Sequence, residues 1–381
     1  MAYLDYAATA PMLPEAKEAM LAAMDEHFGN PSSVHNYGRK AKQIVEDARD
    51  KVAAAVGASP SEIVFTGGGT EADNLAIKGA AHKLRGNGNH VVVTSFEHHA
   101  VLDSVKWLEK QGFEVTTASV DGSGIVDPVR IASKVKSSTV LVSVMTVNNE
   151  IGTIQPIEEI AAKVKSQNPN TLVHTDSVQG LGNVPVDVSR WGVDLAAFAG
   201  HKVGGVKGVG AAYIRSGVSV EAVIHGGGQE RGLRSGTLNV PGIAAFGAAA
   251  EIAAKEVHEK ADRVAQLRDR LLEGITQRLP DVVVNGDLER RVAGNLNISI
   301  PGTEGETLLL LLDMAGIACS SGSACASGAT DPSHVLLSIG VAPDLARGSL
   351  RFSLGRSTTR EEIEVVIEAL PGIVERVRKI S

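Results

Sequence analysis

Cysteine is almost absent from this chain of 381 residues, which contains only Cys319 and Cys325. Two cysteines are too few to stabilise a secreted fold by disulfides or to complete a four-ligand structural zinc site. Their scarcity favours a protein of the reducing cytoplasm. Aromatic residues are also scarce, at 3%, and acidic side chains outnumber basic ones by 44 to 37. Because a nucleic-acid-binding protein needs basic and stacking side chains, that class of protein is disfavoured.

Long apolar runs are missing as well. No segment approaches the roughly 18 consecutive apolar residues of a membrane-spanning helix, and the first residues have the pattern of neither a secretory signal nor an organelle presequence. Hydrophobic residues make up 43% and charged residues 21%, as in an ordinary soluble globular protein. We therefore expect a cytoplasmic protein, and its length predicts two domains.

Short β-branched apolar runs alternate with helical patterns over roughly the first 250 residues. This alternation predicts an α/β fold with a mostly parallel central sheet and helices on both faces. The ligands of such sheets bind at the carboxyl ends of the strands. The predicted strands are Ile63–Phe65, His90–Val93, Val140–Val144, Leu172–Thr175, Leu195–Phe198 and Ala211–Ile214.

A helical pattern without an internal breaker runs from about Pro241 to Leu279 and predicts either one long helix or two. We place the change of domain within it. Residues 15–252 are expected to form a large domain, and residues 1–14 and 253–381 a smaller α/β domain that carries a loop at about 318–334.

A glycine-rich turn, Gly67-Gly68-Gly69-Thr70, follows the first predicted strand and opens a helix. The backbone N–H groups of such a helix start, with the hydroxyl of Thr70, can bind a phosphate group. The turn matches neither the dinucleotide fingerprint nor the P-loop motif. The alternative interpretation is an ordinary turn in which Thr70 caps the helix.

Asp176 and Lys202 follow two successive predicted strands, and Gln179 lies shortly after the first of them. A pyridoxal phosphate (PLP) enzyme requires such a pair, because its lysine forms a Schiff base with the cofactor and its carboxylate pairs with the protonated ring nitrogen. Taken singly, the two residues are more often a surface pair or a strand-end cap. In combination with the glycine-rich turn, they favour the PLP interpretation.

Two further polar positions end predicted strands. His98 follows one strand, and its flat ring can stack on a pyridine ring or shuttle protons; the alternative is a histidine that is satisfied within a loop. Asn149 follows another strand, and its amide can bind a cofactor oxygen or simply form an Asx turn. All these residues are expected at the same edge of the sheet.

Small residues fill the segment from Cys319 to Gly328, so that it predicts an exposed loop that carries Cys325. A thiolate in such a loop can act as a nucleophile, whereas the alternative is an incidental exposed thiol. Cys319 follows apolar residues and is predicted to be a buried small side chain. Arg351, in a predicted strand, is the candidate for binding a substrate carboxylate, ahead of Arg356 in the next turn.

Many of these motifs match one family in order and nearly end to end. The chain resembles the cysteine desulfurases of iron–sulfur cluster assembly, in the class V branch of the fold-type I PLP enzymes, and its loop resembles the long, group I form. The matching segments are Leu4–Thr9, Gly29–His35, Gly69–Glu71, Asn74–Gly79, Glu97-His98, Asn148–Gly152, Gly200–Lys202, Arg234–Thr237, Ser320–Cys325 and Pro332–Leu336.

The resemblance implies a role for each matching residue. Lys202 would be the Schiff-base lysine, Cys325 the residue that attacks the sulfur of L-cysteine, and Arg351 the group that binds the substrate carboxylate. His98 would be both a catalytic acid or base and a group stacked on the ring. The remaining cofactor-binding residues would be Gly69, Thr70, Asn149, Asp176, Gln179, Gly200 and His201, with Thr237 acting in the other subunit, and Asn149 would also contact substrate.

The implied products are L-alanine and a persulfide on Cys325, in a homodimer that passes the sulfur to an iron–sulfur scaffold or another acceptor. No intrinsic metal is implied, although Cys325 is a candidate transient iron–sulfur ligand. Ala199 stands where the family usually has a serine that donates to the phosphate, so one hydrogen bond to the cofactor is expected to be absent. The alternatives are a selenocysteine lyase, another class V aminotransferase, or a sulfur-binding scaffold without turnover.

Overall fold

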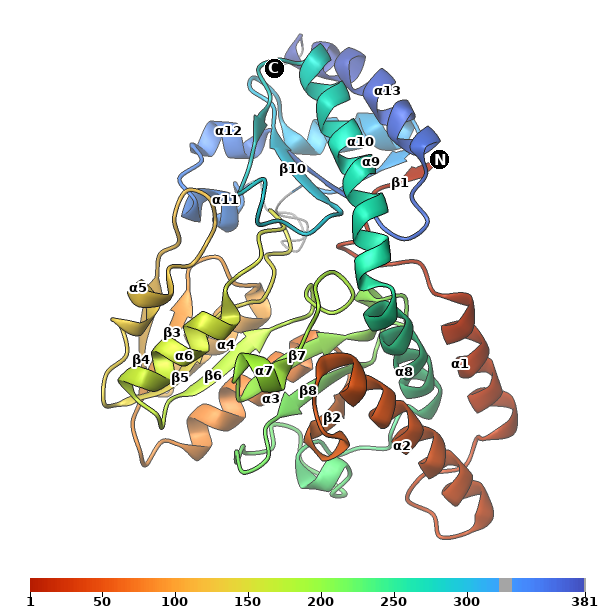
Figure 1. Ribbon diagram of the computed structural model, residues 1–381, viewed down its shortest axis with the longest axis vertical. Coiled ribbons are helices and arrows are strands. Elements are labelled where there is room, and N and C mark those ends of the chain that lie inside the picture. Colours follow the sequence, from red (N-terminus) through yellow and green to blue (C-terminus); the bar gives the residue numbers. More distant parts are fainter. Residues whose placement is uncertain (322–330, 380–381) are drawn as a thin grey trace.

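The computed structural model describes residues 1–321 and 331–379, and its centre is a seven-stranded sheet in the order β2-β8-β7-β6-β5-β3-β4 (Figure 1). β8 is antiparallel to both of its neighbours, and the other strands run in one direction. The mostly parallel sheet predicted from the sequence is confirmed. The strands are β2 (Ile63–Thr66), β3 (His90–Thr94), β4 (Glu114–Ala118), β5 (Thr139–Ser143), β6 (Leu172–Asp176), β7 (Leu195–Ala199) and β8 (Gly210–Ile214).

Helices cover both faces of this sheet. Alternate strand residues enter different cores: Val92 packs in the core beneath α2, α6 and α8, whereas Val91 and Val93 pack in the core beneath α3 and α4. This parity follows from the two-residue period of a strand. The helices are α1 (Pro14–Glu26), α2 (Asn36–Val56), α3 (Gly69–Lys83), α4 (His99–Lys110), α5 (Pro128–Ala132), α6 (Ile157–Gln167), α7 (Val188–Trp191) and α8 (Val240–Lys255).

A third core lies among the C-terminal elements and includes Ala2 and Leu4 from the start of the chain. Its strands form a three-stranded sheet in the order β12-β10-β9 and a parallel pair of β1 and β11 (Figure 1). The elements are β1 (Ala2–Tyr3), α9 (Val257–Arg278), β9 (Val283–Val284), β10 (Asn295–Ser299), α10 (Gly305–Met314), β11 (Ile317–Ala318), α11 (His334–Ser338), α12 (Pro343–Arg347), β12 (Ser349–Ser353) and α13 (Arg360–Arg378).

The long helical pattern predicted from Pro241 to Leu279 forms two helices, α8 and α9, which meet at Glu256. They run end to end along one side of the molecule and connect the large sheet with the C-terminal core (Figure 1). Lys260, in the first turn of α9, donates hydrogen bonds to the Gly182 carbonyl and to Asn183. Among the described residues, no helix is both long and apolar enough to cross a bilayer.

Candidate active site

A cavity of about 320 Å³ lies at the carboxyl edge of the large sheet, where the predicted site was expected. It gathers residues from the ends of β6 and β7, from the start of α3, from the turn before α4 and from β12. The residues predicted from the sequence that line it are Gly69, Thr70, His98, Asn149, Asp176, Gln179, His201, Lys202 and Arg351. Elements far apart in the sequence thus bring these nine residues to one place.

Asp176 is the last residue of β6 and is only 5% exposed. Its Oδ1 accepts a hydrogen bond of 2.9 Å from the backbone N–H of Val178. Burial raises the pKa of this carboxyl, and the neighbouring His98 and Lys202 lower it. A buried carboxylate of this kind favours a cationic N–H as its partner in the cavity.

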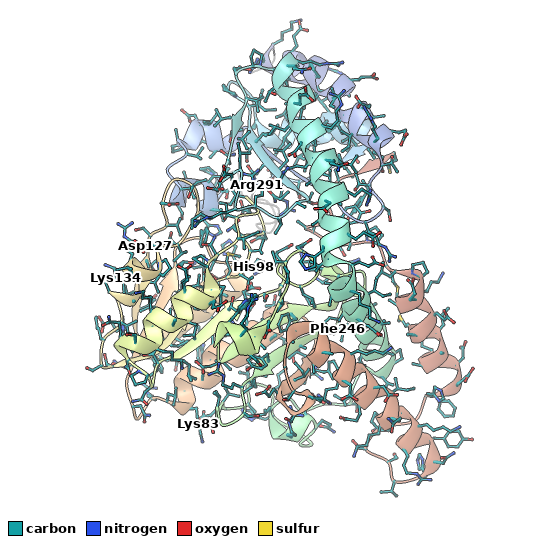
Figure 2. The ribbon with its side chains drawn as sticks, viewed as in Figure 1. Lys83, His98, Asp127, Lys134, Phe246 and Arg291 are labelled. Atoms are coloured by element: carbon teal, nitrogen blue, oxygen red, sulfur yellow. The ribbon has the colours of Figure 1, made fainter. Side chains whose placement is uncertain are left out.

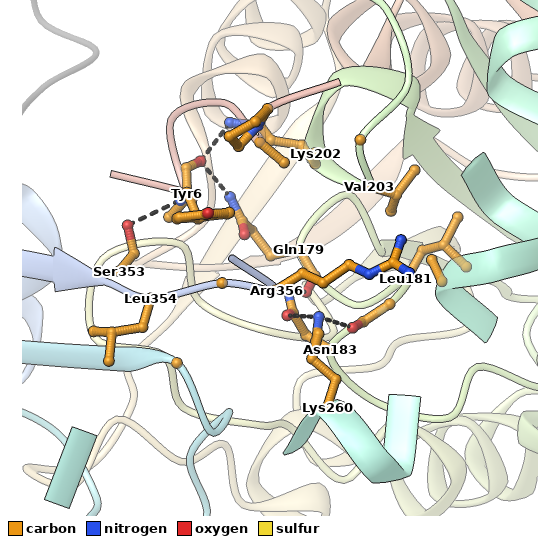
Figure 3. Close-up of a pocket in the computed structure, with 18 of the residues that line it drawn as sticks. Tyr6, Gln179, Leu181, Asn183, Lys202, Val203, Lys260, Ser353, Leu354 and Arg356 are labelled. Carbon is orange, nitrogen blue, oxygen red and sulfur yellow. Dashed lines mark hydrogen bonds between the residues drawn. The ribbon is translucent and has the colours of Figure 1, made fainter. Parts of the chain in front are cut away.

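Lys202 lies in the short turn that follows β7. Its amine reaches residues 3–8, which we call the N-terminal segment. Nζ donates to the carbonyl oxygens of Ala7 and Ala8 at 2.6 and 2.9 Å. Gln179 Nε2 donates to the same Ala7 carbonyl at 2.9 Å, so both side chains meet this segment (Figure 3). Two backbone carbonyl oxygens therefore hold the amine at the cavity.

The start of α3 forms one end of the cavity. Gly68, not Thr70, is the residue that caps this helix, with φ +154° and open space where a side chain would begin. Thr70 instead lies in the first turn, where its hydroxyl and the backbone N–H groups are placed for an anion. His201 also lines the cavity, its Nδ1 lies 3.2 Å from the Thr9 hydroxyl, and burial lowers the pKa of its ring to about 4.

His98 caps α4, because its Nδ1 accepts a hydrogen bond of 3.1 Å from the backbone N–H of Ala100. The ring lies near the centre of the molecule, where the large sheet faces the C-terminal core (Figure 2). A neutral ring in this bond carries its proton on Nε2. His98 therefore has both the shape and the proton needed beside a ligand in the cavity.

Arg351 lies in the middle of β12 and is 3% exposed. Its Nη1 donates to the Asn149 carbonyl at 2.9 Å, and its Nη2 forms an ion pair with Asp5 at 3.0 Å. Its Nε is buried without a hydrogen-bond partner. Arg356 lies in the turn after β12, pairs with Glu256 at 3.0 Å and is 41% exposed, so Arg351 is the arginine that the cavity presents.

Sequence reasoning missed three buried titratable side chains, Asp73, Glu97 and His174, of which Asp73 lines the cavity. Asp73 Oδ1, on α3, lies 3.4 Å from His174 Nε2, and Glu97 lies between β3 and α4, three residues after the end of the strand. Burial raises the pKa of Asp73 well above its usual value and that of Glu97 to about 8, while it lowers the pKa of His174 to about 3. His174 could have been found, because it lies two residues before Asp176 on the same face of β6.

A second cavity of about 350 Å³, drawn in Figure 3, adjoins the first. The two cavities share four lining residues, Ala7, Asn149, Gln179 and Lys202. The second cavity lacks Asp176, His98 and Thr70 among its lining residues. The first cavity is thus the one with the groups that a phosphate-bearing aromatic ring needs.

The other predicted site residues lie elsewhere. Gly200 immediately precedes His201 in the turn after β7. Thr237 is exposed and lines a different cavity together with Phe28. Cys325 lies outside the described residues. Cys319, predicted to be buried, is partly buried against the C-terminal core, and burial raises the pKa of its thiol to about 12.

The fold and the cavity define an α/β enzyme with its site at the carboxyl edge of a mostly parallel sheet. Residues 2–366 match the model of the aminotransferase class-V family, and the chain belongs to that family. The resemblance predicted from the motifs is confirmed at this level.

The chain is similar in sequence to named cysteine desulfurases and in structure to a NifS-like protein. The chain is 49% identical over 381 residues to the cysteine desulfurase IscS of Clostridium botulinum (strain Hall), covering 100% of this chain and 96% of that protein. A solved NifS-like protein superposes with a TM-score of 0.91 at 39% identity, covering 100% and 99% of the two chains. The structure described as SspA in complex with cysteine gives a TM-score of 0.83 at 34% identity, covering 94% and 100%.

Proposed function

We propose that the protein is a PLP-dependent cysteine desulfurase that converts L-cysteine to L-alanine and transfers the sulfur to Cys325 for iron–sulfur cluster biogenesis. Its full-length identity of 49% to a cysteine desulfurase IscS supports this activity. The observation in the structure that carries the proposal is the convergence of Asp176, Lys202, His98 and Arg351 on one cavity.

The residues present fit PLP. The buried Asp176 offers an oxygen to a ring N–H, and the start of α3 offers a phosphate site. Lys202 would hold the cofactor covalently, and His98 would stack on its ring. Asn149 and Gln179 would bind the ring hydroxyl. The phosphate would be held by Gly69, Thr70, Gly200 and His201, together with Thr237 of the partner subunit.

When bound, PLP withdraws electrons from the α-carbon of an amino acid and so eases loss of its α-proton. Arg351 binds the carboxylate of L-cysteine through its buried, unpartnered Nε. Lys202 and His98 move protons at the α- and β-carbons. The Cys325 thiolate attacks the substrate sulfur; the S–S bond forms, the Cβ–S bond breaks, and its electron pair takes up a proton at Cβ. L-Cysteine and one thiol thus yield L-alanine and one persulfide.

The remaining parts of the proposal concern the surroundings of this site. The protein acts in the cytoplasm as a homodimer, and an iron–sulfur scaffold or another acceptor takes the sulfur. The two-domain division, 15–252 against 1–14 and 253–381, belongs to the same proposal. The separate C-terminal core, which includes Leu4 from the start of the chain, supports that division.

The test is release of sulfide and L-alanine from L-cysteine by the PLP-loaded protein in the presence of a thiol reductant. We expect equal amounts of the two products from the wild type and neither product from Cys325→Ala. Cys319→Ala is the matched control, because the raised pKa of this partly buried thiol leaves little thiolate, and we expect it to keep its activity.

Two results would contradict the proposal. Sulfide release by Cys325→Ala at the wild-type rate would exclude a persulfide on this residue. Cofactor absorbance without sulfide from the wild type would instead favour a selenocysteine lyase or another class V aminotransferase. Lys202→Ala distinguishes cofactor loss from substrate choice, because it should abolish the covalent cofactor absorbance itself.

A further inference from the structure

The N-terminal segment touches both functional cations of the candidate site. Asp5 Oδ1 forms the ion pair with Arg351 Nη2 at 3.0 Å. Only two and three residues later, the carbonyl oxygens of Ala7 and Ala8 accept hydrogen bonds from the Lys202 amine. One short stretch of backbone thus connects the proposed carboxylate-binding group with the proposed cofactor-binding group.

This segment is held firmly against β12, the strand that carries Arg351. Asp5 pairs with Ser353 in a parallel bridge, in which the Ser353 N–H donates to Leu4 and the Tyr6 N–H donates to Ser353. The Ala7 N–H donates to the Ser353 hydroxyl at 2.9 Å. The hydrogen-bonded backbone on both sides of Asp5 places this residue next to β12, where its carboxylate pairs with Arg351.

Two of the three nitrogens of the Arg351 guanidinium have protein partners. Nη1 is held by the Asn149 carbonyl and Nη2 by Asp5, whereas Nε is buried and has no partner. The side chain of Arg351 is 3% exposed and that of Asp5 19% exposed, so water screens the pair weakly. Hydrogen bonds at both Nη atoms restrain the plane of the guanidinium and so orient Nε.

We propose that Asp5 is a positioning residue for Arg351, which orients the guanidinium so that an amino-acid carboxylate binds on its Nε side. This inference rests on the proposed role of Arg351 as the carboxylate-binding residue. The opposite interpretation is that Asp5 competes with the substrate for Arg351. The two interpretations predict opposite signs: removal of Asp5 weakens carboxylate binding if Asp5 positions Arg351, and strengthens it if Asp5 competes.

The experiment compares Asp5→Ala and Asp5→Asn in the PLP-loaded protein. L-Alanine, the proposed product, is titrated while the cofactor absorbance is followed, and KM and kcat for L-cysteine are measured separately. For Asp5→Ala we expect Kd for L-alanine and KM to rise about tenfold, in line with loss of one charge-assisted hydrogen bond, and kcat to stay within about threefold. Asp5→Asn keeps an acceptor oxygen and should show about a threefold rise.

Glu362→Gln is the matched control. Glu362 accepts the backbone N–H of Tyr3 at 3.2 Å and so also ties the N-terminal segment to the C-terminal core, but without contacting Arg351. We expect its Kd for L-alanine to stay within about twofold of the wild type. A general loosening of the segment would instead raise Kd in Glu362→Gln and Asp5→Ala alike, which would overturn a specific role for Asp5.

Unchanged or tighter L-alanine binding in Asp5→Ala would also overturn the inference. Arg351→Ala separates this failure from failure of the proposed function. If Arg351→Ala binds L-alanine as the wild type does, Arg351 is not the carboxylate-binding residue. If Arg351→Ala binds weakly and Asp5→Ala binds normally, only the role of Asp5 is wrong. If Asp5→Ala fails to fold, Asp5→Asn decides instead. A higher Kd for L-alanine in Asp5→Asn supports the positioning role, and an unchanged or lower Kd contradicts it.

Discussion

At the residue scale, Glu97 shows how strongly burial changes chemistry near the candidate site. Its Oε1 accepts a hydrogen bond of 2.9 Å from the Met145 N–H and another from the Thr94 hydroxyl, while Oε2 is buried without a partner. Burial raises the pKa of the carboxyl to about 8 from a usual value of 4.5. Glu97 is therefore protonated in the folded protein at neutral pH and ionised in the unfolded chain.

This shift predicts a pH dependence of stability that one substitution removes. Between pH 4.5 and about 8 the folded protein binds a proton that the unfolded chain releases, so stability falls as pH rises, by at most about 1.4 kcal/mol per pH unit. Glu97→Gln keeps the acceptor oxygen and cannot ionise, so its stability lacks this dependence on pH. Urea midpoints at several pH values should show Glu97→Gln gaining on the wild type as pH rises; parallel pH curves would contradict the prediction.

At the element scale, the loop of residues 226–237 is anchored by a buried ion pair. Arg49, on α2, donates to both carboxylate oxygens of Glu230 at 2.8 and 2.7 Å, and the Phe65 N–H of β2 also donates to Glu230. Glu230 and Arg231 have φ angles of 47° and 58°, in the left-handed region. The pair therefore joins a helix, a strand and a strained loop.

Glu230→Ala should lower the free energy of unfolding by about 3–5 kcal/mol, because it leaves the Arg49 guanidinium buried without its carboxylate. The matched control is the exposed pair of Arg190 and Glu158, whose side chains are 60% and 57% exposed. Glu158→Ala should cost less than about 1 kcal/mol. Equal losses for the two variants in chemical denaturation would show that burial of the first pair does not matter.

Two helix glycines make a second comparison at this scale. A Cβ at Gly247, on α8, would lie 2.8 Å from the backbone and side chain of Ala48 on α2, whereas a Cβ at Gly372, on α13, meets nothing within 4 Å. Gly247→Ala should destabilise by about 1–3 kcal/mol through overpacking, and Gly372→Ala should stabilise by about 0.5–1 kcal/mol through chain entropy. Thermal melting measures both; shifts of the same sign would contradict the packing argument.

At the scale of the whole molecule, large apolar side chains are exposed over residues 21–37. Phe28 is 72% exposed, Val34 89% and Tyr37 54%, and the rings of Phe28 and Tyr37 lie 5.2 Å apart. Phe28 also lines a cavity together with Thr237, which is expected to serve the other subunit. A surface with these properties is typical of a protein interface.

We therefore predict that Phe28→Asp weakens the proposed homodimer by at least about tenfold, because a central aromatic contact is replaced by a charge. Sedimentation velocity over a dilution series measures the effect. Leu310→Asp is the control, since Leu310 is 62% exposed on α10, outside this surface, and should leave the dimer intact. A dimer of unchanged stability in Phe28→Asp would exclude this surface as its interface.

Much of this architecture could be predicted from local patterns. The runs that became β2, β3 and β5 to β8 were visible because buried strands need β-branched and apolar residues. β4 was missed because its residues, Glu114–Ala118, are mostly polar and only partly buried at the sheet edge. The joint at Glu256 was left open because no glycine or proline marks it, and packing at the two ends decides where the helix bends.

The sequence by itself determined the chemical groups of the candidate site. Asp176, Lys202 and His98 each follow a recognisable strand within a few residues, so a local pattern was enough to find them. Only the tertiary structure decided which groups face them. Asp5 meets Arg351 across 346 positions of the sequence, Asp73 meets His174, and both of these and Glu97 are buried. Such contacts depend on which elements pack together, and burial, which alters the pKa of each carboxyl and imidazole, exists only once they have packed.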